Sequence, residues 1–176
     1  MRCTHVFLFC AMLLGLAAMP ARASAAAVPT AVFGFEFFDD TQDTRPEILA
    51  EQAERLKRVN AELARLVAGS GEMVGVDLAP QAARIEELAP FYKCNGCEAD
   101  LAAAAGARLE MVGVVRKVSN LILSIALEVK EVGGTEKVVR AGVVDIRGNT
   151  DESWLRGVRY LMKNRILAPG QPALPQ

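Results

Sequence analysis

Two cysteines, Cys94 and Cys97, have a spacing that could support chemistry, and they stand in the stretch FYKCNGCEAD. A pair separated by two residues can be a redox-active dithiol, half of a metal site, an attachment point for c-type haem or a structural disulfide. Covalent haem attachment needs a histidine directly after the second cysteine, and Glu98 stands there. The haem interpretation is therefore excluded.

The first 25 residues have the layout of a Sec-type signal peptide. Arg2 supplies a positive charge, residues 6–18 form an apolar run, and residues 21–25 (ARASA) contain two overlapping cleavage motifs. The apolar run is shorter than the roughly 20 residues that span a bilayer. We therefore predict cleavage after Ala23 or Ala25, a periplasmic location and no transmembrane segment after signal removal.

Loss of this segment removes the only histidine of the chain, His5. A His-dependent nucleophilic triad is then impossible, and a zinc site built from cysteine and histidine would have only two ligands. The 20 basic residues lose Arg2 and Arg22 while all 21 acidic residues stay, so the formal charge falls from −1 to −3. A mildly acidic chain without a basic block does not favour nucleic acid or anionic lipid as a partner.

The remaining residues predict a single α/β domain over 26–167, followed by a proline-containing tail at 168–176 that we expect to be disordered. The apolar patterns predict the order β-α-β-α-α-β-β-β-α. The predicted strands are residues 30–38, 72–78, 109–118, 121–132 and 137–147. Two strand–helix–strand crossovers and a final meander indicate a mixed sheet of about five strands with helices packed on it.

The first predicted helix has a threonine N-cap at Thr44, Pro46 in its first turn and Glu47 at the capping-box position. Its apolar stripe is expected to consist of Leu49, Ala53, Leu56, Leu63 and Leu66, with Val59 and Val67 beside it. One face of the strand predicted at 121–132 should carry Leu121, Leu123, Ile125, Leu127 and Val129. Five aromatic side chains are expected in the core: Phe33, Phe35, Phe37, Phe38 and Trp154.

The strand AVFGFE at 31–36 and the junction GARLEMVGVV at 106–115 resemble segments of the TolB N-terminal domain and of curli-secretion-lipoprotein-like domains. Over most of residues 30–167, the chain is more similar to a family of secreted bacterial proteins of unknown function, with CNGCEADL and DIRGNTDESW as family motifs. This resemblance implies a periplasmic α/β domain that acts as an envelope interaction module. It transfers no active-site residue.

Three interpretations remain for Cys94 and Cys97. Asn95-Gly96 favours the tight turn of a short disulfide, and an oxidising periplasm favours its formation. A redox function is supported by the position of Cys97 just before a predicted helix, because a helix N-terminus lowers a thiol pKa. A metal site would need carboxylates such as Glu98 or Asp100, which match soft thiolates poorly. We favour the structural disulfide.

Two further polar segments are candidates for a ligand or partner site. Arg147-Gly148-Asn149-Thr150-Asp151 runs from a strand into a helix N-terminus, where backbone N–H groups and Arg147 could hold an anion. A helix cap at Asn149 or Thr150 explains the same residues, and we favour it because Asp151 would repel an anion. The basic pair Arg116 and Lys117 is expected to be a solvated hairpin tip.

The sequence thus predicts a secreted, non-catalytic binding or accessory module of the bacterial cell envelope, with no cofactor and no metal. The expected partner is another periplasmic or envelope protein, docked on the exposed face or the edge of the sheet. The alternative is a periplasmic thiol–disulfide redox protein that uses Cys94 and Cys97.

Overall fold

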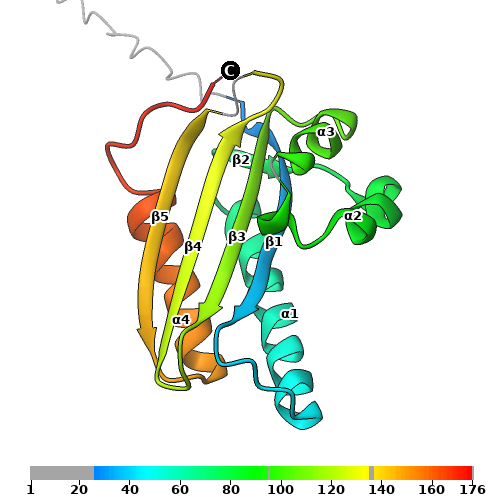
Figure 1. The fold of residues 1–176 in the computed structure, drawn as a ribbon. Helices are drawn as coiled ribbons and strands as arrows, with labels where there is room; N and C mark the ends of the chain where they lie inside the picture. The colour runs from blue at the N-terminus through cyan, green and yellow to red at the C-terminus, as the bar shows by residue number, and fades with distance from the viewer. Residues whose placement is uncertain (1–25, 95, 135–136, 176) are drawn as a thin grey trace, which may run out of the picture.

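A computed structural model describes residues 26–94, 96–134 and 137–175. Its strands are β1 (Val28–Asp39), β2 (Met73–Gly75), β3 (Leu109–Lys117), β4 (Ile122–Glu131) and β5 (Val138–Arg147). They form one sheet in the order β2-β1-β3-β4-β5, in which β1 is parallel to β2 and β3 while β3, β4 and β5 are antiparallel (Figure 1). The predicted α/β class and mixed five-stranded sheet are confirmed.

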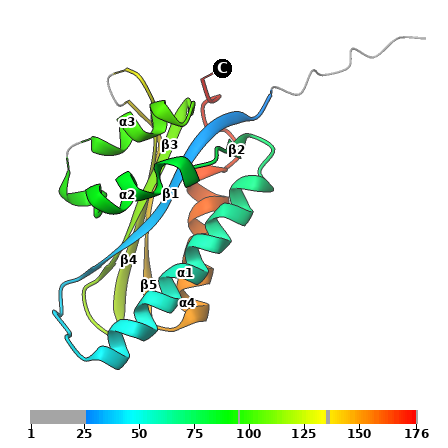
Figure 2. The same ribbon diagram turned by 90° about the vertical axis from the view of Figure 1, so that its right-hand side faces the viewer.

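The helices are α1 (Pro46–Ala68), α2 (Ala82–Leu88), α3 (Cys97–Ala104) and α4 (Asp151–Leu161). Three short helical turns accompany them: η1 (Ala79–Gln81), η2 (Phe91–Lys93) and the π-helical η3 (Met162–Ile166). Helices α1 and α4 pack on one face of the sheet, and α2 and α3 lie on the other (Figure 2). We call these the closed face and the open face, because no helix among the described residues covers the second face over β4 and β5 (Figure 1).

Strand β3 places side chains on both faces of the sheet, because successive side chains of a strand point in opposite directions. Leu109, Met111 and Val115 are fully buried on the closed face, whereas Val112 and Val114 are half-buried on the open face. The same alternation runs along β4 from Leu123 to Val129 as predicted. Leu121, however, precedes β4 and is 72% exposed, so its predicted burial is wrong.

The closed-face core is centred on Trp154 of α4, which is fully buried and stacks on Phe37 with ring centroids 5.5 Å apart. Phe35 is also buried, as predicted, but Phe38 is 36% exposed and lies edge-on against Tyr92. Helix α4 approaches the sheet closely because Gly157 faces it. A Cβ atom at this position would stand 2.7 Å from Ile146 and 2.8 Å from Ile125.

The buried stripe of α1 differs from the predicted one. Val59, Leu63 and Val67 are buried, but Leu49 is 46% exposed and Arg55 is buried instead. The reason is tertiary: the Arg55 guanidinium lies 5.7 Å from the Trp154 ring centroid, so that this face of α1 turns toward α4.

Helices α1 and α4 start in different ways. The N-cap of α1 is the extended Arg45, with no side-chain cap, so the capping box predicted at Thr44 and Glu47 is wrong. A residue before proline avoids the helical region, which makes Arg45 the last non-helical residue before Pro46. Helix α4 does have a capping box, in which Thr150 and Ser153 bond to each other's backbone N–H groups.

The C-terminal tail, which the sequence predicts to be disordered, contacts the rest of the domain at two residues. Residues 168–175 form no regular element, yet Leu174 is buried in the core. Arg140 of β5 donates to the carbonyl oxygens of Ile166 and Pro172, at 2.7 and 3.0 Å. It also pairs with Glu72, ahead of β2.

The predicted signal peptide, residues 1–25, lies outside the described residues, as do Asn95 and residues 135–136 of the predicted turn before β5. Within the described ranges, no helix combines the length and the apolar character that a membrane crossing requires.

Candidate functional site

Cys94 and Cys97 form a disulfide on the open face, as predicted, with Cα atoms 5.8 Å apart. Gly96, between them, has a φ of +85°, a left-handed conformation that side-chain-bearing residues rarely adopt. Helix α3 begins directly after it, so Cys97 is the first helical residue, one position earlier than predicted.

The segment before the disulfide is fixed to β1. The backbone N–H groups of Phe91 and Tyr92 donate to the carboxylate of Glu36, at 2.5 and 3.1 Å. The Phe91 ring also meets the Phe33 ring edge-on, with centroids 5.0 Å apart. This anchoring holds Cys94 over the sheet, with its sulfur 3.4 Å from the carbonyl oxygen of Phe91.

Three charged side chains meet beside the disulfide. Glu98 of α3 is only 4% exposed, and its Oε1 lies 2.8 Å from Nζ of Lys130 on β4. The same Nζ is 3.6 Å from Oε1 of Glu110, which is fully buried on β3. Pairing of this kind makes buried carboxylates tolerable. Desolvation acts to lower the pKa of Lys130, but the Glu98 hydrogen bond and the nearby glutamate charges outweigh it and raise that pKa.

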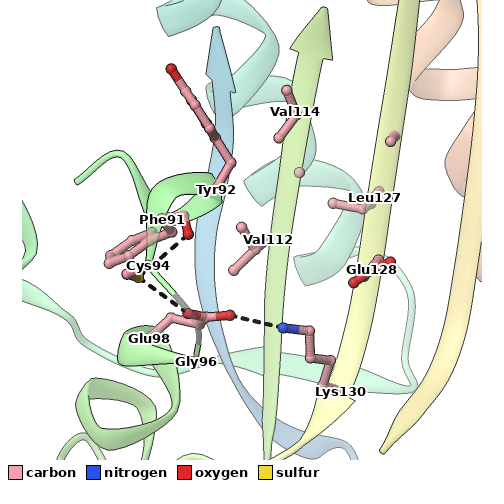
Figure 3. A pocket seen from close by; sticks show the side chains of 12 residues that line it. Phe91, Tyr92, Cys94, Gly96, Glu98, Val112, Val114, Leu127, Glu128 and Lys130 are labelled. Carbon is pink, nitrogen blue, oxygen red and sulfur yellow. Dashed lines mark hydrogen bonds and ion pairs between the residues drawn. The ribbon is translucent and has the colours of Figure 1, made fainter. Parts of the chain in front are cut away.

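A groove of about 320 Å³ lies between the cysteine segment and the open face of β3 and β4 (Figure 3). Val112, Val114 and Ala126 line it from the sheet, and Cys94 lines it from the segment above. Cys97 is not among the lining residues. In Figure 3, Cys94, Glu98 and Lys130 form a chain of contacts along this groove, in which Oε2 of Glu98 is 3.8 Å from the Cys94 sulfur.

The two sulfurs and a carboxylate oxygen of Glu98 lie within 4.8 Å of one another, the spacing of a candidate metal site. Thiolates, not disulfide sulfurs, are the ligands that metals bind. In the bonded state Cys94 and Cys97 offer no thiolate, and Glu98 is engaged by Lys130. The chemistry that this geometry supports directly is therefore that of a disulfide beside a groove.

The candidate segment 147–151 lies at the end of the sheet where β3 finishes, and its polar groups support helix α4. Asn149 accepts hydrogen bonds from Nε1 of Trp154 at 2.9 Å and from Arg55 at 3.1 Å. Thr150 is the N-cap, and Asp151 pairs with Arg55 and Arg58. Gly148 donates its N–H to Leu121, which joins this segment to the turn after β3. Arg147 is exposed beside it.

Arg116 and Lys117 come to the same end of the sheet but have different environments. Arg116 is exposed and pairs with Asp40 at 2.6 Å. Lys117 is fully buried on the closed face, and its Nζ lies 2.9 Å from Asp39. The predicted solvated tip is therefore wrong for Lys117. Burial acts to raise the pKa of Asp39, but hydrogen bonds from Thr41 and Lys117 outweigh it and lower that pKa.

Three residues of the cysteine groove and its anchor were missed in the sequence: Glu36, Glu110 and Lys130. A signal existed for two of them, because Glu110 and Lys130 stand directly opposite in the β3–β4 register. If the residues of both strands are counted outward from the turn between them, Glu110 and Lys130 fall opposite each other, with charges of opposite sign. The contact of Glu36 with the η2 backbone had no such signal, since 55 residues separate Glu36 from Phe91.

The family model DUF3280, described as "Protein of unknown function (DUF2380)", matches residues 28–166. The protein belongs to this family. The match includes all five strands and agrees with the extent of the resemblance seen in the sequence. No curated protein matches this DUF3280 chain.

Among solved structures, the DUF3280 protein is similar to lipoprotein GNA1162 from Neisseria meningitidis, with 11% identity, 70% of this chain and 83% of that chain covered, and a TM-score of 0.50. It is also similar to the LpoB C-terminal domain from Escherichia coli (16% identity, 74% and 88% covered, TM-score 0.44). A third similar structure is the PelC dodecamer from Paraburkholderia phytofirmans (13% identity, 80% and 89% covered, TM-score 0.47). At such identities, the likeness to GNA1162 shows a shared fold alone.

Proposed function

We propose that this DUF3280 protein is a secreted, non-catalytic binding module of the bacterial cell envelope that engages another protein. The observation that carries this proposal is an apolar row on the open face. Val114, Ala126 and Val143 stand opposite one another across β3, β4 and β5. The closed face already packs two helices against its apolar residues, whereas the row on the open face has no helix over it and ends in an exposed apolar residue that a partner can cover.

The row becomes more accessible from the centre of the sheet toward its edge. Val114 and Ala126 are half-buried, whereas Val143 is 59% exposed on the edge strand β5. A partner that covers Val143 would also reach the outer backbone of β5, because an edge strand presents unpaired N–H and C=O groups. Both features of the docking surface expected from the sequence, an exposed face and an edge, therefore meet at this residue.

A photoreactive amino acid at position 143 tests the proposal in living cells. We expect a discrete adduct with one envelope protein, identified by mass spectrometry. The matched control is position 49 on α1, since Leu49 is similarly exposed but lies on the other side of the molecule. Identical adducts from both positions, or none from position 143, would contradict the proposal.

Secretion is tested separately by fractionation and N-terminal sequencing. The predicted signal peptide and the resemblance to the TolB N-terminal domain support a periplasmic location. We expect the mature protein in the periplasm to begin at Ser24 or Ala26. An uncleaved chain in the cytoplasm would contradict this expectation.

The groove beside the disulfide favours a second candidate, a periplasmic thiol–disulfide protein, because Cys94 lines a groove that a partner thiol can enter. Titration with glutathione distinguishes the two roles of this bond. A reduction potential near about −120 to −200 mV supports redox function, and a value below about −300 mV supports a structural bond.

A further inference from the structure

We infer that the Cys94–Cys97 disulfide reacts in one direction: a thiolate in the groove attacks the sulfur of Cys94, and Cys97 leaves. The inference rests on the second candidate function, and it names the sulfur attacked and the class of substrate. That substrate is a cysteine thiol of another protein, carried by a segment with apolar neighbours. Three independent features of the site give this direction.

The first feature is access. Both cysteines are half-buried, but Cys94 is among the residues that line the groove and Cys97 is not. The sheet side of the groove carries the apolar residues Val112, Val114 and Ala126 beside the charged Glu128 and Lys130. An extended segment lying on these residues brings its own cysteine to Cys94 rather than to Cys97.

The second feature is the leaving group. Cys97 is the first residue of the eight-residue helix α3, whose N-terminal partial charge stabilises a thiolate. A thiol of lower pKa leaves faster in exchange reactions. Asp100 in the first turn opposes this effect, while the charge of Glu98 is offset by Lys130.

The third feature is where a proton resides after reduction. The Cys94 sulfur has two acceptors in place, the carbonyl oxygen of Phe91 at 3.4 Å and Oε2 of Glu98 at 3.8 Å (Figure 3). Acceptors beside a thiol favour its protonated form. In the reduced protein, Cys94 therefore keeps its proton, and Cys97 is the thiolate. The other charged residues around the pair are Glu36, Lys93, Glu110, Glu128 and Lys130, with Asp100 in the first turn of α3.

The reaction balances without another reagent. The partner thiol loses its proton to solvent, and its sulfur forms a bond with the sulfur of Cys94. The Cys94–Cys97 bond breaks, and its electron pair stays on Cys97 as a thiolate. The partner sulfur is thereby oxidised, and Cys97 is reduced.

The direct test uses the mature, oxidised protein purified from the periplasm, with glutathione as the probe. Brief reaction, acid quenching and alkylation trap the mixed disulfide, and tandem mass spectrometry locates each group. We expect glutathione on Cys94 and the alkyl group on Cys97. Glutathione on Cys97, or on both residues equally, would overturn the inference.

Thiol pKa values give a second readout that does not need the trapped species. Iodoacetamide rates against pH are measured for Cys97 in the Cys94→Ser variant and for Cys94 in the Cys97→Ser variant. We expect Cys97 to have the lower pKa by about one unit, a tenfold difference in thiolate fraction. An equal or higher pKa at Cys97 would overturn the inference.

Glu98 acts in this scheme as a positioning residue, so Glu98→Gln should lower the pKa of Cys94 in the Cys97→Ser background. The matched control is Asp100→Asn, in the same helical turn but exposed. A shift of equal size in both variants would remove the specific role of Glu98.

The groove is tested with two thiols of different size. Ala126→Arg should slow reaction with a valine-flanked cysteine peptide about tenfold but leave dithiothreitol unaffected, because only the peptide must lie on the sheet. Leu49→Arg is the control on α1. Equal slowing of both thiols would overturn the groove assignment. A reduction potential of the Cys94–Cys97 disulfide below the redox range would remove the second candidate function. The direction of attack is decided separately, by which of the two sulfurs carries glutathione.

Discussion

On the closed face, Lys117 is fully buried and bonds to the single carboxylate of Asp39, whereas on the open face Lys130 keeps 16% of its side chain exposed between Glu98 and Glu110. On the first face, the charge of Lys117 is balanced by one carboxylate. On the second face, two carboxylates share one ammonium group beside a groove and a disulfide. The comparison indicates that the closed face provides stability, while the open face holds a buried charge cluster and a half-buried disulfide beside a groove.

The largest expected effect on this comparison comes from the centre of the closed face. Trp154→Ala should lower the free energy of unfolding by about 3–5 kcal/mol, because it removes the buried ring that packs against Phe37 and Arg55. Urea denaturation followed by circular dichroism measures the loss. Tyr160→Ala on the same helix is the control, since Tyr160 is 48% exposed. Equal losses would contradict the assignment of the core to this face.

The open face is next, and here the charge cluster should contribute. Lys130→Met leaves Glu98 and Glu110 buried without their shared cation, so we expect a loss of about 3 kcal/mol in unfolding free energy. Lys137→Met is the control, because the Lys137 side chain is 69% exposed and 3.9 Å from its partner Glu131. If both variants lose the same small amount, the cluster does not stabilise the open face.

A smaller, pH-dependent effect is expected where α1 meets α4. Hydrogen bonds from Arg65 and then Arg159 lower the pKa of Glu62 from 4.5 to about 2. A carboxyl with a lowered folded-state pKa stabilises the protein above its unfolded-state pKa and loses this contribution as pH falls through the folded value. Wild-type stability should therefore drop between pH 5 and 2 by about 1 kcal/mol more than that of Glu62→Gln, since both arginines are largely exposed. Parallel pH curves would refute the assignment.

The smallest change in stability is expected at the edge of the open face. Val143→Asp should alter the unfolding free energy by less than about 0.5 kcal/mol, because Val143 is 59% exposed. The same substitution should abolish partner binding measured by co-purification of the crosslinked protein identified at position 143. Unchanged partner binding would show that the apolar row is not part of the docking surface.

Local patterns in the sequence predicted much of this fold. The strand alternation, the chain order of the elements and the helix cap at Asn149 or Thr150 all depend on residues within a few positions of one another. The burial of Lys117 could also have been predicted from the sequence, because Lys117 continues the alternating row of Leu109 and Met111. Its partner was not predictable, because Asp39 stands opposite Lys117 only through the parallel register of β1 and β3, and the two residues are 78 positions apart.

The candidate site was predictable only in its covalent part. The spacing of Cys94 and Cys97 predicted their bond, but the groove depends on contacts between α3, η2 and two strands. Glu98 was named in the sequence only as a carboxylate that could join the cysteines in a metal site. Its burial depends on Lys130, which reaches it from β4, a contact between residues 32 positions apart.

Gly157 has a consequence for how this family can diverge. Its missing side chain is the space that Ile125 and Ile146 occupy, so the three positions share one fixed volume. A relative with alanine at position 157 should carry a smaller residue, such as valine, at one of the other two positions. Covariation among these three positions in an alignment of the family would thus record how closely the last helix lies against the sheet in each lineage.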